Sequence, residues 1–84
     1  YPNPFNPVTE IQFDVPQESQ VQLTIYNIMG QEVTTLNNST LQAGFHSIRW
    51  DGTNGLGEQV STGVYFYRLS SPAFTSTKKM IMVK

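Results

Sequence analysis

The sequence predicts an all-β fold, an antiparallel immunoglobulin-like β-sandwich of about seven strands. Apolar and polar residues alternate along most of the chain, which is the pattern of half-buried strands. Turn-forming residues recur about every 8–12 residues, and no stretch has the period of a helix of three turns. The 84 residues have room for one domain with one core, and without cysteine that core must be held by packing alone.

The first half of the chain predicts three strands. The first strand covers residues 8–15 and the second covers residues 20–26, because both have apolar residues at every second position. The stretch "YNIMGQEV" predicts a tight hairpin, since Asn27 and Gly30 suit the first and fourth positions of a turn. This hairpin leads into a third strand over residues 31–36.

Two connections flank the fourth strand. The polar stretches "NNST" and "LQAG", residues 37–44, predict a loose connection, and the alternation of His46, Ile48 and Trp50 with polar residues predicts the strand itself. Residues 51–63 form the longest turn-rich stretch, in which Asp and Asn side chains can cap turns. The glycines that can supply positive φ there are Gly52, Gly55 and Gly57.

The last two strands are expected over residues 64–70 and 74–84, with a break at Ser71-Pro72. The strand over 64–70, "VYFYRLS", has apolar residues on both faces. Such a strand either lies centrally in its sheet, with its second face covered by loops, or presents an aromatic surface to a partner, and a place in the core is the preferred interpretation.

Residues 1–7, "YPNPFNP", precede the strand pattern. Proline fixes φ and disfavours helix in the residue before it, so this stretch is expected to be an extended lead-in from a preceding linker. The sandwich itself is then expected over residues 8–84.

Charge and hydropathy exclude two classes of partner. The net charge of −1 argues against a nucleic-acid-binding protein, which needs a basic face. The longest apolar runs, "VYFY" and "MIMV", are far shorter than the roughly 20 residues of a membrane-spanning helix. All Lys and Arg residues lie in residues 49–84, which predicts that strands from the two halves pair, or that a cationic last strand meets a receptor.

Four stretches carry a family resemblance over nearly the whole chain. They are "YPNPFNP-T-I-F--P", "Y---G--V", the pattern "AG-H---WDG-N--G--V-TGVY-Y-L" and the basic and apolar ending "KKMIMVK". In this order they resemble the type A C-terminal sorting domain of the type IX secretion system. The middle section is also similar to the immunoglobulin-like domain of the flagellar hook-capping protein.

The sorting-domain resemblance implies recognition without catalysis and without a cofactor. It implies that the chain ends a larger exported protein of a Gram-negative bacterium, whose cargo domain lies N-terminal to it. The cargo would reach the periplasm, and the outer-membrane translocon would then read the domain. A sortase-like peptidase would in some cases cleave the domain and anchor the cargo at the cell surface.

The same resemblance places the partner-binding signal in the last strand. Its residues here are Lys78, Lys79, Met80, Ile81, Met82, Val83 and Lys84. An extended segment of this kind can add to the sheet edge of a receptor through backbone hydrogen bonds, with specificity from alternate side chains. The methionines share one face, and Ile81 and Val83 share the other, so the same residues also suit the core of a last strand.

Other residues suggest chemistry less specifically. His46 is the only histidine, and its place in a strand pattern favours a hydrogen-bonded, partly buried side chain over a catalytic one. Asp51, Asn54 and Glu58 supply oxygen atoms that calcium would accept, but turn capping explains the first two more simply.

Two alternative functions remain at this stage. A carbohydrate-binding module would use exposed aromatic rings, here Trp50, Tyr26, Tyr65 and Tyr67, although Trp50 and Tyr67 fall on expected core faces. A purely structural module would act as a spacer for an extracellular enzyme or as a scaffold of the hook-capping kind.

Overall fold

The computed structural model describes residues 9–83, which form six strands and no helix. The strands are β1 (Thr9–Val15), β2 (Ser19–Asn27), β3 (Glu32–Leu41), β4 (Gly44–Trp50), β5 (Gly63–Ser70) and β6 (Thr75–Met82). The lead-in expected over residues 1–7 lies outside the described residues, as do Val8 and Lys84. No apolar helix of membrane-spanning length occurs in the described range.

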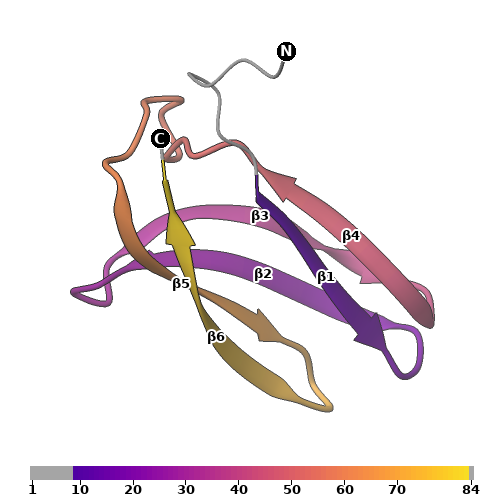
Figure 1. Cartoon of the computed structure of the whole chain (residues 1–84). Helices are drawn as coiled ribbons and strands as arrows, with labels where there is room; N and C mark the ends of the chain where they lie inside the picture. Colours follow the sequence, from indigo (N-terminus) through magenta and orange to yellow (C-terminus); the bar gives the residue numbers. More distant parts are fainter. Residues whose placement is uncertain (1–8, 84) are drawn as a thin grey trace.

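The six strands form two antiparallel sheets that face each other (Figure 1). One sheet pairs β1 with β4, and the other has the order β3-β2-β5-β6. Every strand pairing is antiparallel. The predicted antiparallel sandwich is therefore confirmed, with six strands in the described residues where about seven were expected.

The core lies between the two sheets. Alternate residues of each strand point inward because successive side chains of a strand leave opposite faces. β5 is central as predicted, since it lies between β2 and β6, but its second face is not fully covered, because Phe66 is half-buried and Arg68 is exposed. The buried apolar side chains are Ile11, Phe13, Val15, Val21, Leu23, Ile25, Trp50, Tyr65, Leu69 and Met82.

Two turns at one end of the sandwich repeat the same construction. In the β2–β3 hairpin, the Asn27 side-chain oxygen accepts hydrogen bonds from the backbone N–H groups of Met29 and Gln31, at 2.9 and 3.0 Å. In the loop between β4 and β5, the Asn54 side-chain oxygen accepts from Leu56 and Glu58, at 2.9 and 3.0 Å. The sequence "NIMGQ" thus folds as "NGLGE" does.

Each of these turns needs a glycine at its fourth position. Gly30 and Gly57 both have φ of 82°, a conformation that side-chain-bearing residues rarely adopt. Their N–H groups donate to the carbonyl oxygens of Asn27 and Asn54, at 2.9 and 3.0 Å. The predicted hairpin turn is therefore confirmed, and so is the turn-capping role of Asn54.

Replacing Gly57 by alanine is expected to lower the free energy of unfolding by about 1–2 kcal/mol, because the new Cβ strains a backbone with positive φ. Gly55→Ala is the matched control. Gly55 does not have positive φ, contrary to the prediction, and a Cβ there would make ordinary contact at 3.8 Å with the Val33 carbonyl oxygen. Urea denaturation of both variants measures the difference, and an equal loss would contradict this account of the turn.

The connection predicted over residues 37–44 is wrong, because most of that stretch is strand. β3 continues to Leu41, and its residues 37–41 pair with β2. Its polar residues lie on a strand at the sheet edge and bond to side chains of β2, as when the Gln20 side-chain amide donates to the Asn38 Oδ1 at 2.9 Å. With few apolar residues to bury, this part of the strand lacks the alternation that marks strands in a sequence.

Charge complementarity between the two halves holds for one strand pair. Glu10 of β1 lies opposite Arg49 of β4 in the register, as opposite charges in neighbouring strands favour. Lys78 and Lys79 of β6 instead lie opposite Tyr67 and Phe66 of β5. The basic end of the chain is therefore not paired with an acidic strand.

Candidate partner-binding site

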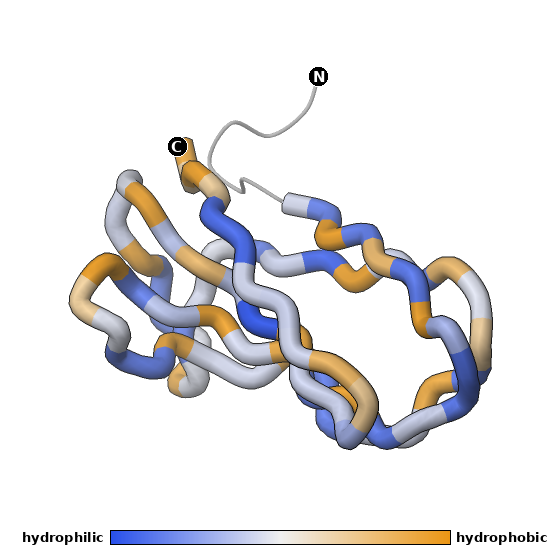
Figure 2. The backbone as a smooth tube through the Cα atoms, turned by 90° about the horizontal axis from the view of Figure 1, so that it is seen from below, coloured by the Kyte–Doolittle hydropathy of each residue, from blue (hydrophilic) through white to orange (hydrophobic). Residues whose placement is uncertain are grey.

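The predicted partner-binding residues occupy the last strand and the residues just after it. We call residues 78–84 the terminal segment. Its residues 78–82 belong to β6, Val83 follows the strand, and Lys84 lies outside the described residues. In Figure 2 the tube changes from blue at the lysines to orange toward the C-terminal end.

Side chains of the terminal segment alternate between the core and the solvent. Met82 is fully buried, with 1% of its surface exposed, and Met80 packs against the core cluster. Ile81 and Val83 are 62% and 65% exposed, and both lysines are exposed. The predicted division of the segment into two faces is confirmed, so its methionines fix it to the fold while its other side chains face solvent.

Met82 also ties the segment to the loop between β4 and β5. A Cβ built on Gly52, whose φ is 79°, would lie 3.4 Å from the terminal methyl carbon of Met82. The loop backbone therefore approaches the Met82 side chain closely, and glycine leaves room for this contact.

The backbone of β6 offers an open edge. Within residues 9–83, β6 pairs only with β5 and ends the four-stranded sheet. A strand at a sheet edge has backbone N–H and C=O groups that point away from the sheet and can pair with a further strand. This geometry suits recognition by strand addition.

Exposed apolar side chains gather at the same end of the sandwich. The register sets the end of β2 beside the start of β5, and the start of β5 beside the end of β6. The loop between β4 and β5 joins this end because the Gly55 N–H donates to the Val33 carbonyl oxygen at 3.0 Å. Five large apolar residues more than half exposed lie here: Ile28, Met29, Leu56, Ile81 and Val83. Ile28, Met29 and Leu56 were not among the residues predicted from the sequence, although the repeated turn sequence in which they lie is a signal that could have found them.

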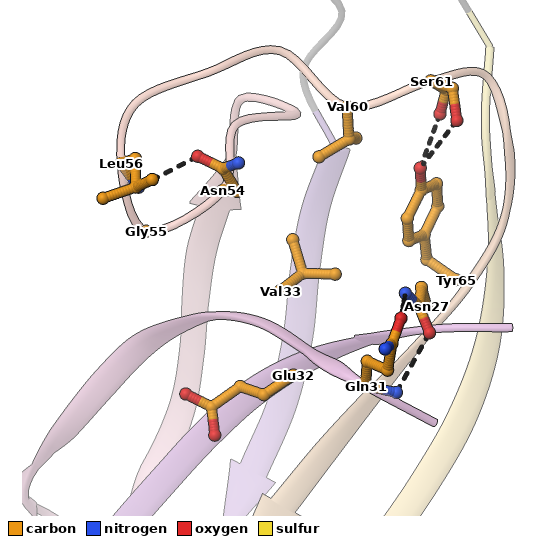
Figure 3. Close-up of a pocket in the computed structure, with 10 residues that line it drawn as sticks. All are labelled: Asn27, Gln31, Glu32, Val33, Asn54, Gly55, Leu56, Val60, Ser61 and Tyr65. Atoms are coloured by element: carbon orange, nitrogen blue, oxygen red, sulfur yellow. Dashed lines mark hydrogen bonds between the residues drawn. The ribbon is translucent and has the colours of Figure 1, made fainter. Parts of the chain in front are cut away.

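A hollow of about 740 Å³ lies between the two repeated turns (Figure 3). It is lined by Asn27, Gln31, Glu32, Val33, Asn54, Gly55, Leu56, Val60, Ser61 and Tyr65. Most of its polar groups are already bonded within the protein. The Asn27 amide donates to Gln31 and the Asn54 amide to Glu58, at 2.9 and 3.1 Å, so the lining is explained by turn structure.

One side chain in this hollow, that of Tyr65, is hydrogen-bonded to the loop between β4 and β5. The Tyr65 hydroxyl donates to the Ser61 carbonyl oxygen at 2.6 Å, and 6% of the tyrosine is exposed. A tyrosine near the start of a strand that bonds backbone a few residues upstream is typical of immunoglobulin-like sandwiches.

Tyr65→Phe is expected to lower the free energy of unfolding by about 1 kcal/mol, because the hydrogen bond from the tyrosine hydroxyl to the Ser61 carbonyl oxygen is lost. Tyr67→Phe serves as the control, since the Tyr67 hydroxyl has no hydrogen-bond partner among residues 9–83. Thermal unfolding of both variants would compare them. Equal melting temperatures would show that the Tyr65 hydroxyl contributes nothing.

The other sequence-predicted residues have structural roles. The His46 Nε2 lies 2.7 Å from the Gln42 carbonyl oxygen, and its ring stacks on Phe13 with centroids 5.7 Å apart. The prediction of a hydrogen-bonded, partly buried histidine is confirmed. Asp51 Oδ1 accepts from the Thr53 N–H and hydroxyl, at 3.1 and 2.6 Å, as expected of turn capping. No cluster of three acidic or histidine side chains that could hold a metal occurs within residues 9–83.

The four aromatic residues considered for carbohydrate binding do not form one surface. Trp50 and Tyr65 are buried and pack edge to face, with ring centroids 5.2 Å apart. Tyr67 packs against the core cluster, whereas Tyr26 points to the opposite face of the four-stranded sheet from the buried Ile25. A row of these four rings is therefore ruled out.

Comparison with known proteins identifies the fold family. The crystal structure of FlgD from P. aeruginosa matches with a TM-score of 0.72 and 22% sequence identity, over 89% of this chain and 58% of that one. This chain thus spans little more than half the length of that chain, and the likeness shows the fold. No curated protein matches. The family model of the FlgD Ig-like domain matches residues 5–73, a range that ends before β6. Since that match covers well over half of the chain, the protein belongs to the FlgD Ig-like domain family.

Proposed function

We propose that this protein is a non-catalytic sorting module whose terminal segment is read by the type IX translocon. One observation carries the proposal. The terminal segment is anchored in the core by Met82, while Lys78, Lys79, Ile81 and Val83 face solvent on an open sheet edge. A segment built in this way is held extended and still has one backbone edge and its exposed side chains free for a receptor.

The proposed mechanism is strand addition. A receptor strand pairs with the open edge of β6, and backbone hydrogen bonds supply affinity. The exposed Ile81 and Val83 supply apolar contacts, and the lysines favour an acidic receptor surface. Because the segment is already ordered, little conformational entropy is lost on binding.

The partners follow from the sorting resemblance. They are the outer-membrane translocon, a cargo domain N-terminal to residue 1 in the same chain, and in some cases a sortase-like peptidase. The proposed location is the cell surface or the medium of a Gram-negative bacterium, reached through the periplasm.

A second candidate function is structural, as a scaffold module of the hook-capping kind. The family match over residues 5–73 favours it, because that range contains the first five strands of the sandwich. This candidate gives the terminal segment no receptor, so the two functions differ in what β6 does.

A secretion assay tests the proposal. A fluorescent carrier with a periplasmic export signal, fused before residue 1, is produced in a type IX-competent bacterium and in the same strain without the translocon. We expect the carrier in the medium or on the surface of the first strain and in the periplasm of the second. Periplasmic retention in both would reject the sorting function and favour the structural one.

A further inference from the structure

The four-stranded sheet has a second face that points away from β1 and β4. Residues of β2 and β5 that alternate with the core residues lie on this outer face, because side chains of a strand leave opposite sides. On β5 the outer-face residues are Phe66, Arg68 and Ser70. They alternate along the strand with core-facing residues such as the buried Tyr65 and Leu69. The outer face has no covering sheet among residues 9–83, since β1 and β4 pack on the core side.

Arg68 lies between two shallow hollows on this face. One hollow, of about 270 Å³, is lined by Tyr26, Gly30, Phe66, Arg68 and Thr77. The other, of about 180 Å³, is lined by Gln22, Thr24, Tyr26, Arg68 and Ser70. Because Tyr26 and Arg68 line both, the two hollows form one continuous surface.

The Arg68 guanidinium is exposed and has no hydrogen-bond or ion-pair partner among the described residues. No carboxylate lines either hollow. The acidic residue closest by register is Glu32, opposite Tyr26 on β3, and its carboxylate accepts from the Thr35 hydroxyl at 3.3 Å. Lys79 lies opposite Phe66 and adds a second positive charge to the face. The surface is therefore complementary to an anion.

The remaining lining residues define the rest of the ligand. Tyr26 and Phe66 are half-buried rings beside Arg68, and they can pack against an apolar ring face. The other exposed or half-buried polar groups are uncharged hydroxyls and an amide, from Gln22, Ser70 and Thr77. Uncharged groups of this kind can form hydrogen bonds with the hydroxyls of a sugar.

We infer that the outer face binds a carboxylate-bearing polysaccharide, with Arg68 holding a uronate carboxylate in a bidentate pair and Tyr26 and Phe66 packing against sugar rings. Neither aromatic residue of this site belongs to the hydrophobic core. Apart from the flanking Lys79, the site uses no residue of the terminal segment, so the inference stands whether or not that segment is a sorting signal.

The test is a titration of the 84-residue chain with trigalacturonate, followed by amide chemical shifts in NMR spectra. Saturable shifts are expected at Tyr26, Phe66 and Arg68. The fully methyl-esterified trisaccharide should bind at least about tenfold more weakly, because it lacks the carboxylate that pairs with the guanidinium. This comparison needs no protein variant.

Two matched variants place the binding on Arg68. Arg68→Gln is expected to weaken trigalacturonate binding at least about tenfold, and Arg68→Lys to weaken it less, since lysine keeps the charge and loses the planar fork. Arg49→Gln removes the same charge from an exposed position on β4, in the other sheet, and should leave affinity unchanged.

Four results would overturn the inference. They are no saturable shifts on the outer face, equal affinity for the methyl ester, equal losses in Arg68→Gln and Arg49→Gln, and tighter binding of a triglutamate peptide than of trigalacturonate. The last result would reassign the face to an acidic protein partner.

Discussion

Replacing Trp50 by alanine is expected to lower the free energy of unfolding by about 3–5 kcal/mol. Trp50 is 1% exposed and packs edge to face on Tyr65. Its indole N–H donates to the Thr53 carbonyl oxygen at 2.8 Å, which ties the start of the loop between β4 and β5 to the core. Such a loss is a large part of the about 5–15 kcal/mol that stabilises a typical domain.

Leu56→Ala is the matched control, because it also truncates a large apolar side chain but at a position that is 84% exposed. Its free energy of unfolding should stay within about 0.5 kcal/mol of the wild type. Urea denaturation followed by far-UV circular dichroism compares the two, since tryptophan fluorescence is lost in one of them. A Trp50→Ala domain as stable as Leu56→Ala would contradict the central place of the indole in the core.

Substitutions of exposed side chains in the terminal segment are expected to abolish export without unfolding the domain. Reversing charge with Lys78→Glu and Lys79→Glu, or removing apolar contacts with Ile81→Ser and Val83→Ser, changes only exposed side chains. Each pair should lower export of the fused carrier to the level of the carrier alone, because strand addition loses the side chains that give it specificity.

Deleting the terminal segment would be a poorer experiment. It would also remove Met82, whose replacement by alanine alone is expected to cost about 2–5 kcal/mol. The better control is Phe45→Ser, which removes an apolar side chain that is 89% exposed on the other sheet. If Phe45→Ser reduced export as much as the substitutions in the terminal segment, the effect would not belong to that segment.

The sequence predicted those elements whose side chains divide between core and solvent. β1, β2 and β4 were found because apolar residues at every second position mark an inward face. The second half of β3 was missed, since Asn37, Asn38 and their neighbours lie on an edge strand and bury little. Alternation of apolar and polar residues indicates that one face of a strand is buried. An edge strand made of polar residues can form without such alternation.

The candidate site was predictable in part. The two faces of the terminal segment follow from the alternation of side chains along a strand. The turns at Asn27 and Asn54 were predictable from these residue types. The strand order did not follow, because pairing of β5 with β2 is a long-range contact that no local pattern encodes. Three features depend on that strand order and could be seen only in the structure. They are the open edge of β6, the exposed apolar side chains beside it and the lack of a partner for Arg68.

Site-specific photo-crosslinking during export tests the central claim most directly. A photoreactive amino acid at position 81, on the exposed face of β6, is compared with one at position 45, on the exposed face of β4. We expect position 81 to crosslink to a component of the translocon in export-competent cells and position 45 to give no such product. Crosslinking from position 45 alone, or from neither position while the carrier is exported, would show that the translocon reads another part of the domain.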